Sequence, residues 1–168
     1  MTANLVNPPF HTAPGRGDAI WHLGALLTFK ATSAATGGRC WAKEMLAPRG
    51  VATPRHVHTH EDEAFYVLDG EVSVYVGDEV EHATPGSFLW APRAVPHAFC
   101  IESDIARILV VSTGDFDRFF RDTGTPATSP TLPPPTTEPP DIDALVAAAQ
   151  EYGVTTVGPP PAPLMLGS

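Results

Sequence analysis

The sequence predicts an all-β fold, a sandwich or barrel of antiparallel strands, followed by a proline-rich linker and short C-terminal helices. The central part of the chain consists of short β-type runs that are separated by glycine, proline and acidic residues. It shows no strong helical period before residue 115. The length of 168 residues fits one domain, and a hydrophobic content of 43% is sufficient for one buried core.

Eight segments of the central part are predicted strands. They are residues 20–31, 39–47, 53–59, 63–68, 72–76, 87–90, 97–101 and 106–112. A short helix is predicted for residues 115–122, with Asp115 as its N-cap, because Phe116, Phe119 and Phe120 fall on one helical face. We therefore expect residues 15–125 to form a single β-barrel domain.

The C-terminal part differs in composition from this domain. Of the 19 prolines, eleven follow residue 125, and residues 126–140 show no apolar periodicity, which is typical of an extended linker. A helix is predicted for residues 141–152, beginning at the cap Asp141 and ending before Gly153. Its apolar face consists of Ile142, Leu145, Val146, Ala149 and Tyr152. We expect residues 141–168 to pack on the barrel or on a second copy of the chain, and the sequence leaves both possibilities open.

Composition excludes several classes of function. Ten Lys and Arg residues against nineteen Asp and Glu residues give a net charge of −9, which argues against a nucleic-acid partner. No apolar run reaches the roughly 18 residues that span a bilayer, so no membrane association is expected. The first 17 residues show no secretory signal pattern, and the expected location is the cytoplasm. Cys40 and Cys100 are expected to be buried, reduced thiols.

The clearest chemical signal is a cluster of histidines. His56, His58 and His60 lie within five residues, and strand alternation places His56 and His58 on one face. Glu63 follows after a turn, and His97 begins another predicted strand that could lie beside residues 53–59. A solvated polar strand face is the alternative interpretation of the histidines. A site of mixed nitrogen and oxygen ligands suits one divalent transition metal ion per chain, such as nickel, manganese, iron, cobalt or zinc.

The spacing of these residues resembles the first sequence motif of the cupins. Gly50 is followed after five residues by His56, then by His58, after four residues by Glu63 and after six residues by Gly70. Every position and every spacing of that motif is present.

The second cupin motif is matched in part. Gly86, Pro92 and His97 stand at motif positions, whereas Ala94 replaces a glycine and Ile101 replaces an asparagine. The replacements lie outside the metal ligands and affect the local turn. The resemblance implies a cupin jelly-roll β-barrel with the ion inside, held by the ligands His56, His58, Glu63 and His97.

Three further stretches, residues 19–25, 36–39 and 151–160, resemble small single-domain cupins of the quercetin 2,3-dioxygenase group. This resemblance implies a metal-dependent dioxygenase that cleaves a flavonol or related enolic aromatic with O2 and releases carbon monoxide, with Glu63 as the catalytic base. Two alternatives remain. One is a redox-neutral isomerase, cyclase or lyase, and the other is a non-catalytic small-molecule-binding cupin. Pairing through edge strands or terminal arms, common among jelly-roll domains, leads us to expect a homodimer.

Strand parity also suggests residues that line a substrate cavity. Phe65 and Val67 share the side of Glu63, and Phe99 and Ile101 share the side of His97. These four residues either bind the aromatic substrate or fill the barrel. The same two interpretations, lining the cavity or packing between sheets, apply to Trp21, Trp41, Phe88 and Trp90.

The remaining histidines and acidic residues near the cluster are expected to lie outside the site. His60 is predicted at an exposed strand end, and Glu61 and Asp62 are predicted to form a solvated acidic turn. His11, His22 and His82 are expected on the surface or in loops.

Overall fold

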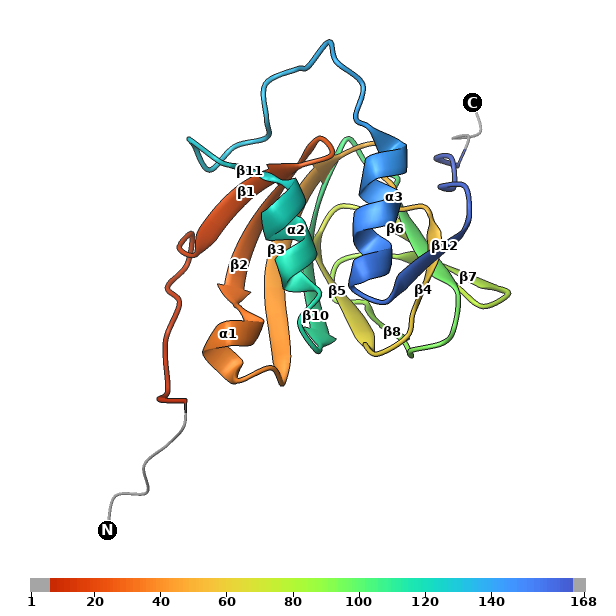
Figure 1. Ribbon diagram of the computed structural model, residues 1–168. Helices are drawn as coiled ribbons and strands as arrows, with labels where there is room; N and C mark the ends of the chain where they lie inside the picture. The colour runs from red at the N-terminus through yellow and green to blue at the C-terminus, as the bar shows by residue number, and fades with distance from the viewer. Residues whose placement is uncertain (1–6, 165–168) are drawn as a thin grey trace.

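The computed structural model describes residues 7–164, which form two antiparallel β-sheets (Figure 1). The first sheet has the strand order β11-β1-β2-β3-β10-β5-β8, and the second has the order β12-β4-β9-β6-β7. The strands of the first sheet are β1 (Asp18–His22), β2 (Ala25–Ala31), β3 (Cys40–Pro48), β5 (Glu63–Asp69), β8 (Phe88–Ala91), β10 (Ile105–Thr113) and β11 (Thr125–Pro126). Those of the second sheet are β4 (Arg55–His58), β6 (Val72–Val76), β7 (Glu79–Ala83), β9 (His97–Ile101) and β12 (Val154–Gly158). The predicted all-β jelly-roll class is confirmed.

Strand alternation builds the core between the sheets. β3 buries every second residue, including Trp41 and Met45, and β10 buries Ile108 and Val110 in the same way. Because β3 and β10 are neighbours in one sheet, their buried residues face the same interior.

Three helices accompany the sheets: α1 (Ser33–Thr36), α2 (Asp117–Thr123) and α3 (Ile142–Glu151). Helices α2 and α3 contact each other and lie on the same side of the barrel (Figure 1). The Asp141 carboxylate accepts a hydrogen bond from the Ala144 amide at 3.0 Å and caps α3 as predicted. Leu145 and Tyr152 pack against the core of the same chain, so α3 packs in cis in this structure.

The predicted N-cap of the helix at residue 115 is wrong. Helix α2 begins at Asp117, and its N-cap residue Phe116 makes no side-chain cap hydrogen bond. Asp115 instead forms an ion pair with Arg118, with 3.3 Å between Oδ2 and Nη1.

Two turns are relevant to the sequence predictions. The segment predicted as one strand over residues 20–31 is the hairpin β1–β2, because Leu23 and Gly24 turn the chain with φ values of 47° and 81°. Ala94, which replaces a glycine of the second cupin motif, has a φ of 63°. The chain therefore keeps the left-handed turn that the glycine would favour, at a cost in backbone strain.

Residues 127–141 contain no helix or strand, although the indole nitrogen of Trp21 donates a hydrogen bond to the Thr131 carbonyl at 2.8 Å. Cys40 is half-buried and Cys100 is buried, and both thiols are free. Among residues 7–164, the structure contains no helix of the length and apolar character needed to cross a bilayer.

Candidate metal centre

The two sheets bring four predicted ligands together. His56 and His58 come from β4, His97 from β9 and Glu63 from β5 of the other sheet. One ligand atom from each residue lies within 4.8 Å of all the others. His56 and His97 are direct partners in the β4–β9 register, and their ring centroids are 4.5 Å apart. A single ion of the kind that imidazole and carboxylate bind could be held between the sheets here.

The orientation of two imidazoles is fixed by backbone carbonyls. The Nδ1 of His56 lies 2.7 Å from the Pro54 oxygen, and the Nδ1 of His97 lies 3.0 Å from the Val95 oxygen. Donation from Nδ1 leaves Nε2 of each ring as the unprotonated nitrogen that can bind a metal ion.

The third imidazole is oriented by a carboxylate. The Nδ1 of His58 lies 2.9 Å from Oε2 of Glu61. The Nε2 atoms of His58 and His97 are buried and have no hydrogen-bond partner among the described residues. A buried polar atom without a partner is costly, and a metal ion would satisfy both nitrogens, so the residues fit the implied ion.

The predicted exposure of Glu61 is therefore wrong. Its side chain is 3% exposed, and its Oε1 accepts a hydrogen bond from the Phe116 amide at 2.6 Å. A Cβ atom on Gly114, whose φ is 74°, would lie 2.6 Å from the same oxygen, so a glycine is needed beside this carboxylate. Asp62, in contrast, pairs with the exposed Arg93, with 3.1 Å between Oδ1 and Nε.

The charge states of Glu63 and His56 suit metal binding. Burial raises the pKa of Glu63, but the close approach of His97 and the charges of His58, His97 and Lys43 outweigh it and lower the pKa to about 2. Burial, together with the charges of His97 and His58, lowers the pKa of His56 to about 4. At neutral pH, Glu63 is thus a carboxylate and His56 a neutral imidazole, which are the forms that bind a metal ion.

Phe116, the residue before α2, packs against the cluster, and two further aromatic side chains pack against Phe116. The Phe116 ring packs edge-on against His58 at 5.0 Å, stacks on Phe119 at 4.8 Å and contacts Tyr152 at 6.2 Å. The His58 and His97 side chains are each 1% exposed. These two ligands are consequently shielded from water, whereas His56 is only half-buried.

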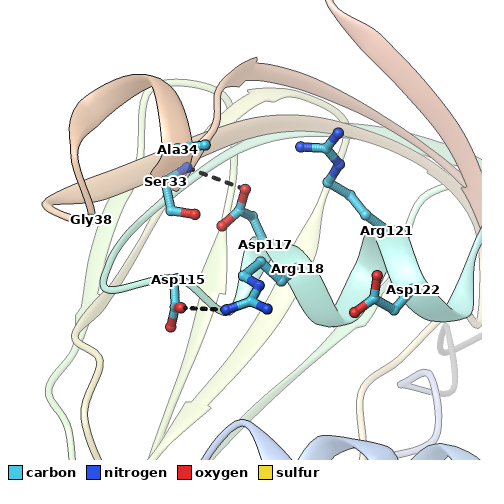
Figure 2. Close-up of a pocket in the computed structure, with 8 residues that line it drawn as sticks. All are labelled: Ser33, Ala34, Gly38, Asp115, Asp117, Arg118, Arg121 and Asp122. Atoms are coloured by element: carbon cyan, nitrogen blue, oxygen red, sulfur yellow. Dashed lines mark hydrogen bonds and ion pairs between the residues drawn. The ribbon is translucent and has the colours of Figure 1, made fainter. Parts of the chain in front are cut away.

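Two surface hollows lie away from the ligands. One, of about 560 Å³, lies between α1 and α2 (Figure 2), where Asp117 Oδ2 accepts a hydrogen bond from the Ser33 amide at 3.2 Å. The other, of about 440 Å³, is lined by residues of β7 and β8 such as His82 and Phe88. None of the four candidate ligands lines either hollow.

The residues expected to line a cavity are all inside the barrel. Phe65, Val67, Phe99 and Ile101 are between 0 and 7% exposed and belong to the hydrophobic core. The Phe65 ring packs beside a ligand, with its centroid 6.4 Å from that of His97 and 6.1 Å from that of Phe99.

The large aromatic residues divide between interior and exterior. Trp41 is fully buried in the core, whereas Phe88 and Trp90 are 64% and 51% exposed. Neither interpretation offered for Phe88 and Trp90 is correct, because both side chains point outward from the edge strand β8.

Sequence reasoning also misplaced His22 and did not identify Lys43. His22 lies on β1, packs on the Phe119 and Phe120 rings and has its Nε2 3.0 Å from the Thr123 hydroxyl. Lys43 is 4% exposed and shares the buried face of β3 with Trp41. The alternation of β3 was the signal for Lys43, since an inward-facing Trp41 places residue 43 inward as well.

Two facing antiparallel sheets, with three imidazoles and a carboxylate converging between them, define a jelly-roll barrel with a candidate metal site. Residues 42–112 match the family described as the cupin domain, so this part of the barrel is similar to that family. The sequence is similar to quercetin 2,3-dioxygenase of Bacillus subtilis (strain 168), with 27% identity over 119 residues. The alignment covers 70% of this chain and 35% of that protein, so the chain spans about a third of its relative's length.

Solved structures support the same fold. KdgF from Halomonas sp. has a TM-score of 0.57 and 18% identity, over 67% of this chain and 98% of that chain. Oxalate decarboxylase from Bacillus subtilis has a TM-score of 0.54 and 18% identity, over 67% of this chain and 30% of that chain. At these identities the likeness shows the fold alone.

Proposed function

We propose that this protein is a metal-dependent dioxygenase that cleaves a flavonol or a related enolic aromatic compound with O2 and releases carbon monoxide. The observation that carries the proposal is the convergence of His56, His58, Glu63 and His97, with two buried Nε2 atoms that lack partners. The similarity to a quercetin 2,3-dioxygenase supports the choice of reaction. The cofactor would be one divalent nickel, manganese, iron, cobalt or zinc ion per chain.

A metal ion held by these four side chains would supply Lewis acidity that lowers the pKa of a substrate hydroxyl. Glu63 is ionised at neutral pH and is the carboxylate of the cluster, so its Oε atoms are positioned to accept the hydroxyl proton. His97 Nε2 lies 3.3 Å from Glu63 Oε2, a separation that lets both atoms bind one ion. Phe65 and Phe116, which pack beside His97 and His58, exclude water and offer aromatic surface to a flat substrate.

The overall reaction is balanced without a further reductant. A flavonol and O2 give a ring-opened ester and carbon monoxide. Two carbon–carbon bonds of the substrate break, and both atoms of O2 enter the ester.

The test is flavonol consumption by metal-free protein reconstituted separately with nickel, manganese, cobalt or iron(II), followed by visible absorbance in air and without oxygen. We expect loss of the flavonol band only in air, with one metal clearly ahead. Consumption that is independent of oxygen would support the redox-neutral isomerase, cyclase or lyase class instead. Tight binding without any product after prolonged incubation in air would support a non-catalytic binding protein.

We also propose that the protein is a homodimer. The exposed Phe88 and Trp90 side chains on the edge strand β8 support pairing of two copies there. Light scattering should return twice the chain mass, and a single chain mass would contradict this.

A further inference from the structure

The interior of the barrel contains a cation that the metal centre does not use. Lys43 lies on the buried face of β3 and is 4% exposed. Its ammonium lies 3.2 Å from the Phe120 ring centroid and 5.1 Å from that of Trp41. Among residues 7–164 it has no ion pair and no hydrogen bond, and the carboxylates that act on it do so at longer range. A buried charge held mainly by aromatic faces is expensive, because such contacts replace only part of its hydration.

A second unpartnered donor lies beside it. The Trp41 indole Nε1 is buried and has no hydrogen-bond partner among the described residues. Trp41 and Lys43 are two residues apart on one strand, so their side chains project from the same face. The interior of the barrel therefore contains two adjacent donors, one of them charged, that lack an acceptor among the described residues.

The strand register relates these donors to the metal centre. Trp41 pairs with Ser112, and Ser112 pairs with Glu63 on the other side of β10. Two strand spacings place the Trp41 position about 10 Å from the Glu63 position along the same inner row. Glu63, Asp117 and Glu61 are the charged groups that act on Lys43, which places its ammonium in the same electrostatic environment as the ligands.

We propose that Lys43 and the Trp41 indole N–H form a second polar contact point of the substrate site. They bind an oxyanion or hydroxyl oxygen that the substrate carries far from its metal-binding end. The inference rests on the proposed function, because the metal centre is the first contact point of the substrate. It identifies the substrate class as an extended aromatic with an acidic oxygen at both ends. An enolic aromatic with only one such oxygen would leave Lys43 unpaired.

The electrostatics are in keeping with this role. Burial lowers the pKa of Lys43 to about 7, although the carboxylates of Glu63, Asp117 and Glu61 raise it. An amine that is only partly charged at neutral pH gains its full charge when an oxyanion binds next to it.

The test compares two flavonols that share the enol but differ in remote hydroxyls. Quercetin carries hydroxyl groups on its outer rings, and 3-hydroxyflavone carries none. Binding to the nickel-loaded protein is measured without oxygen through quenching of tryptophan fluorescence. In Lys43→Met, we expect the dissociation constant of quercetin to rise about 10- to 100-fold, as for loss of a hydrogen bond to a charged group, and that of 3-hydroxyflavone to stay the same.

The controls separate a binding role from a structural one. Lys30 is the other lysine of the chain and pairs with Glu44 at 3.1 Å, so Lys30→Met should bind both flavonols as the wild type does. Lys43→Met should unfold at the same or a higher temperature, because it removes an unpaired buried charge and keeps an apolar side chain. Trp41→Phe removes only the second donor and should weaken quercetin binding by a smaller factor, which tests the proposal even if Lys43→Met does not fold.

The outcomes distinguish this inference from the proposed function. Equal weakening of both flavonols, unchanged binding of both, or no quercetin binding to the wild type would overturn the role of Lys43. Quercetin binding that depends on Lys43, without consumption in air, would overturn the dioxygenase activity and leave this inference standing.

Discussion

Glu61 offers the sharpest test of whether the protein orients its metal-binding histidines, because it contacts His58. Its two oxygens accept from two different N–H donors, His58 Nδ1 at 2.9 Å and the Phe116 amide at 2.6 Å. A glutamine at this position has one acceptor oxygen, so its amide NH2 group must face one of the two donors. Glu61→Gln therefore loses a charge-assisted hydrogen bond, which corresponds to about 1.5–3 kcal/mol.

The expected effect on metal affinity follows from the orientation of His58. Groups that orient a metal-binding histidine typically change metal affinity by about 10- to 100-fold when they are replaced. Competition with a chromophoric chelator for nickel or zinc at neutral pH measures this change. Asp62→Asn is the matched control, because Asp62 is the adjacent carboxylate in the chain and pairs with the exposed Arg93 instead.

A second variant reaches the same carboxylate by a different route. Gly114→Ala introduces a Cβ at 2.6 Å from Glu61 Oε1 and a side chain at a φ of 74°. It should lower metal affinity in the same direction as Glu61→Gln. Wild-type affinity in both variants, or an equal loss in Asp62→Asn, would refute the argument that Glu61 holds His58 for the metal.

Three further predictions concern catalysis, strain and pH. Glu63→Gln should retain part of the metal and lose about 100-fold or more of the flavonol turnover, as expected for removal of a positioned base; a full rate would count against the base role. Ala94→Gly should raise the free energy of unfolding by about 1 kcal/mol in denaturant titrations, because Ala94 has a φ of 63°, and no gain would show that the turn is unstrained. Burial, with a smaller contribution from a nearby lysine charge, lowers the pKa of His22 from 6.5 to about 4, so the unfolded chain takes up a proton first as the pH falls. The free energy of unfolding should then fall by about 3 kcal/mol between pH 6.5 and 4. His22→Gln should remove this part of the pH dependence of the free energy of unfolding. His82→Gln, at an exposed position, should leave it unchanged.

Two strands were predicted from the sequence with the bounds that the structure has. Residues 72–76 and 97–101 were predicted as strands and are β6 and β9 with the same bounds. Strand β7 was missed because four of its five residues are exposed, so it shows no apolar alternation. Strand β12 was missed because it is a short C-terminal segment that is completed by pairing with β4, far away in the sequence.

The ligand cluster was predictable from the sequence, whereas Glu61 and Lys43 beside it were not. His56, His58 and Glu63 are close in sequence. Because side chains alternate along a strand, their spacing alone indicates that they can face one site. Glu61 was misassigned because its partner amide belongs to Phe116, 55 residues later, and no local pattern records that contact. Lys43 lacks a local chemical partner in the same way, and only the parity of β3 places it inside the barrel.

The fate of molecular oxygen shows whether the protein is a dioxygenase. The metal-reconstituted protein is incubated with quercetin under oxygen-18 gas, and the ring-opened product is analysed by mass spectrometry. We expect a product that carries both labelled oxygen atoms, with release of an equal amount of carbon monoxide. A product that carries no label from the gas, or that forms equally well without oxygen, would contradict this expectation.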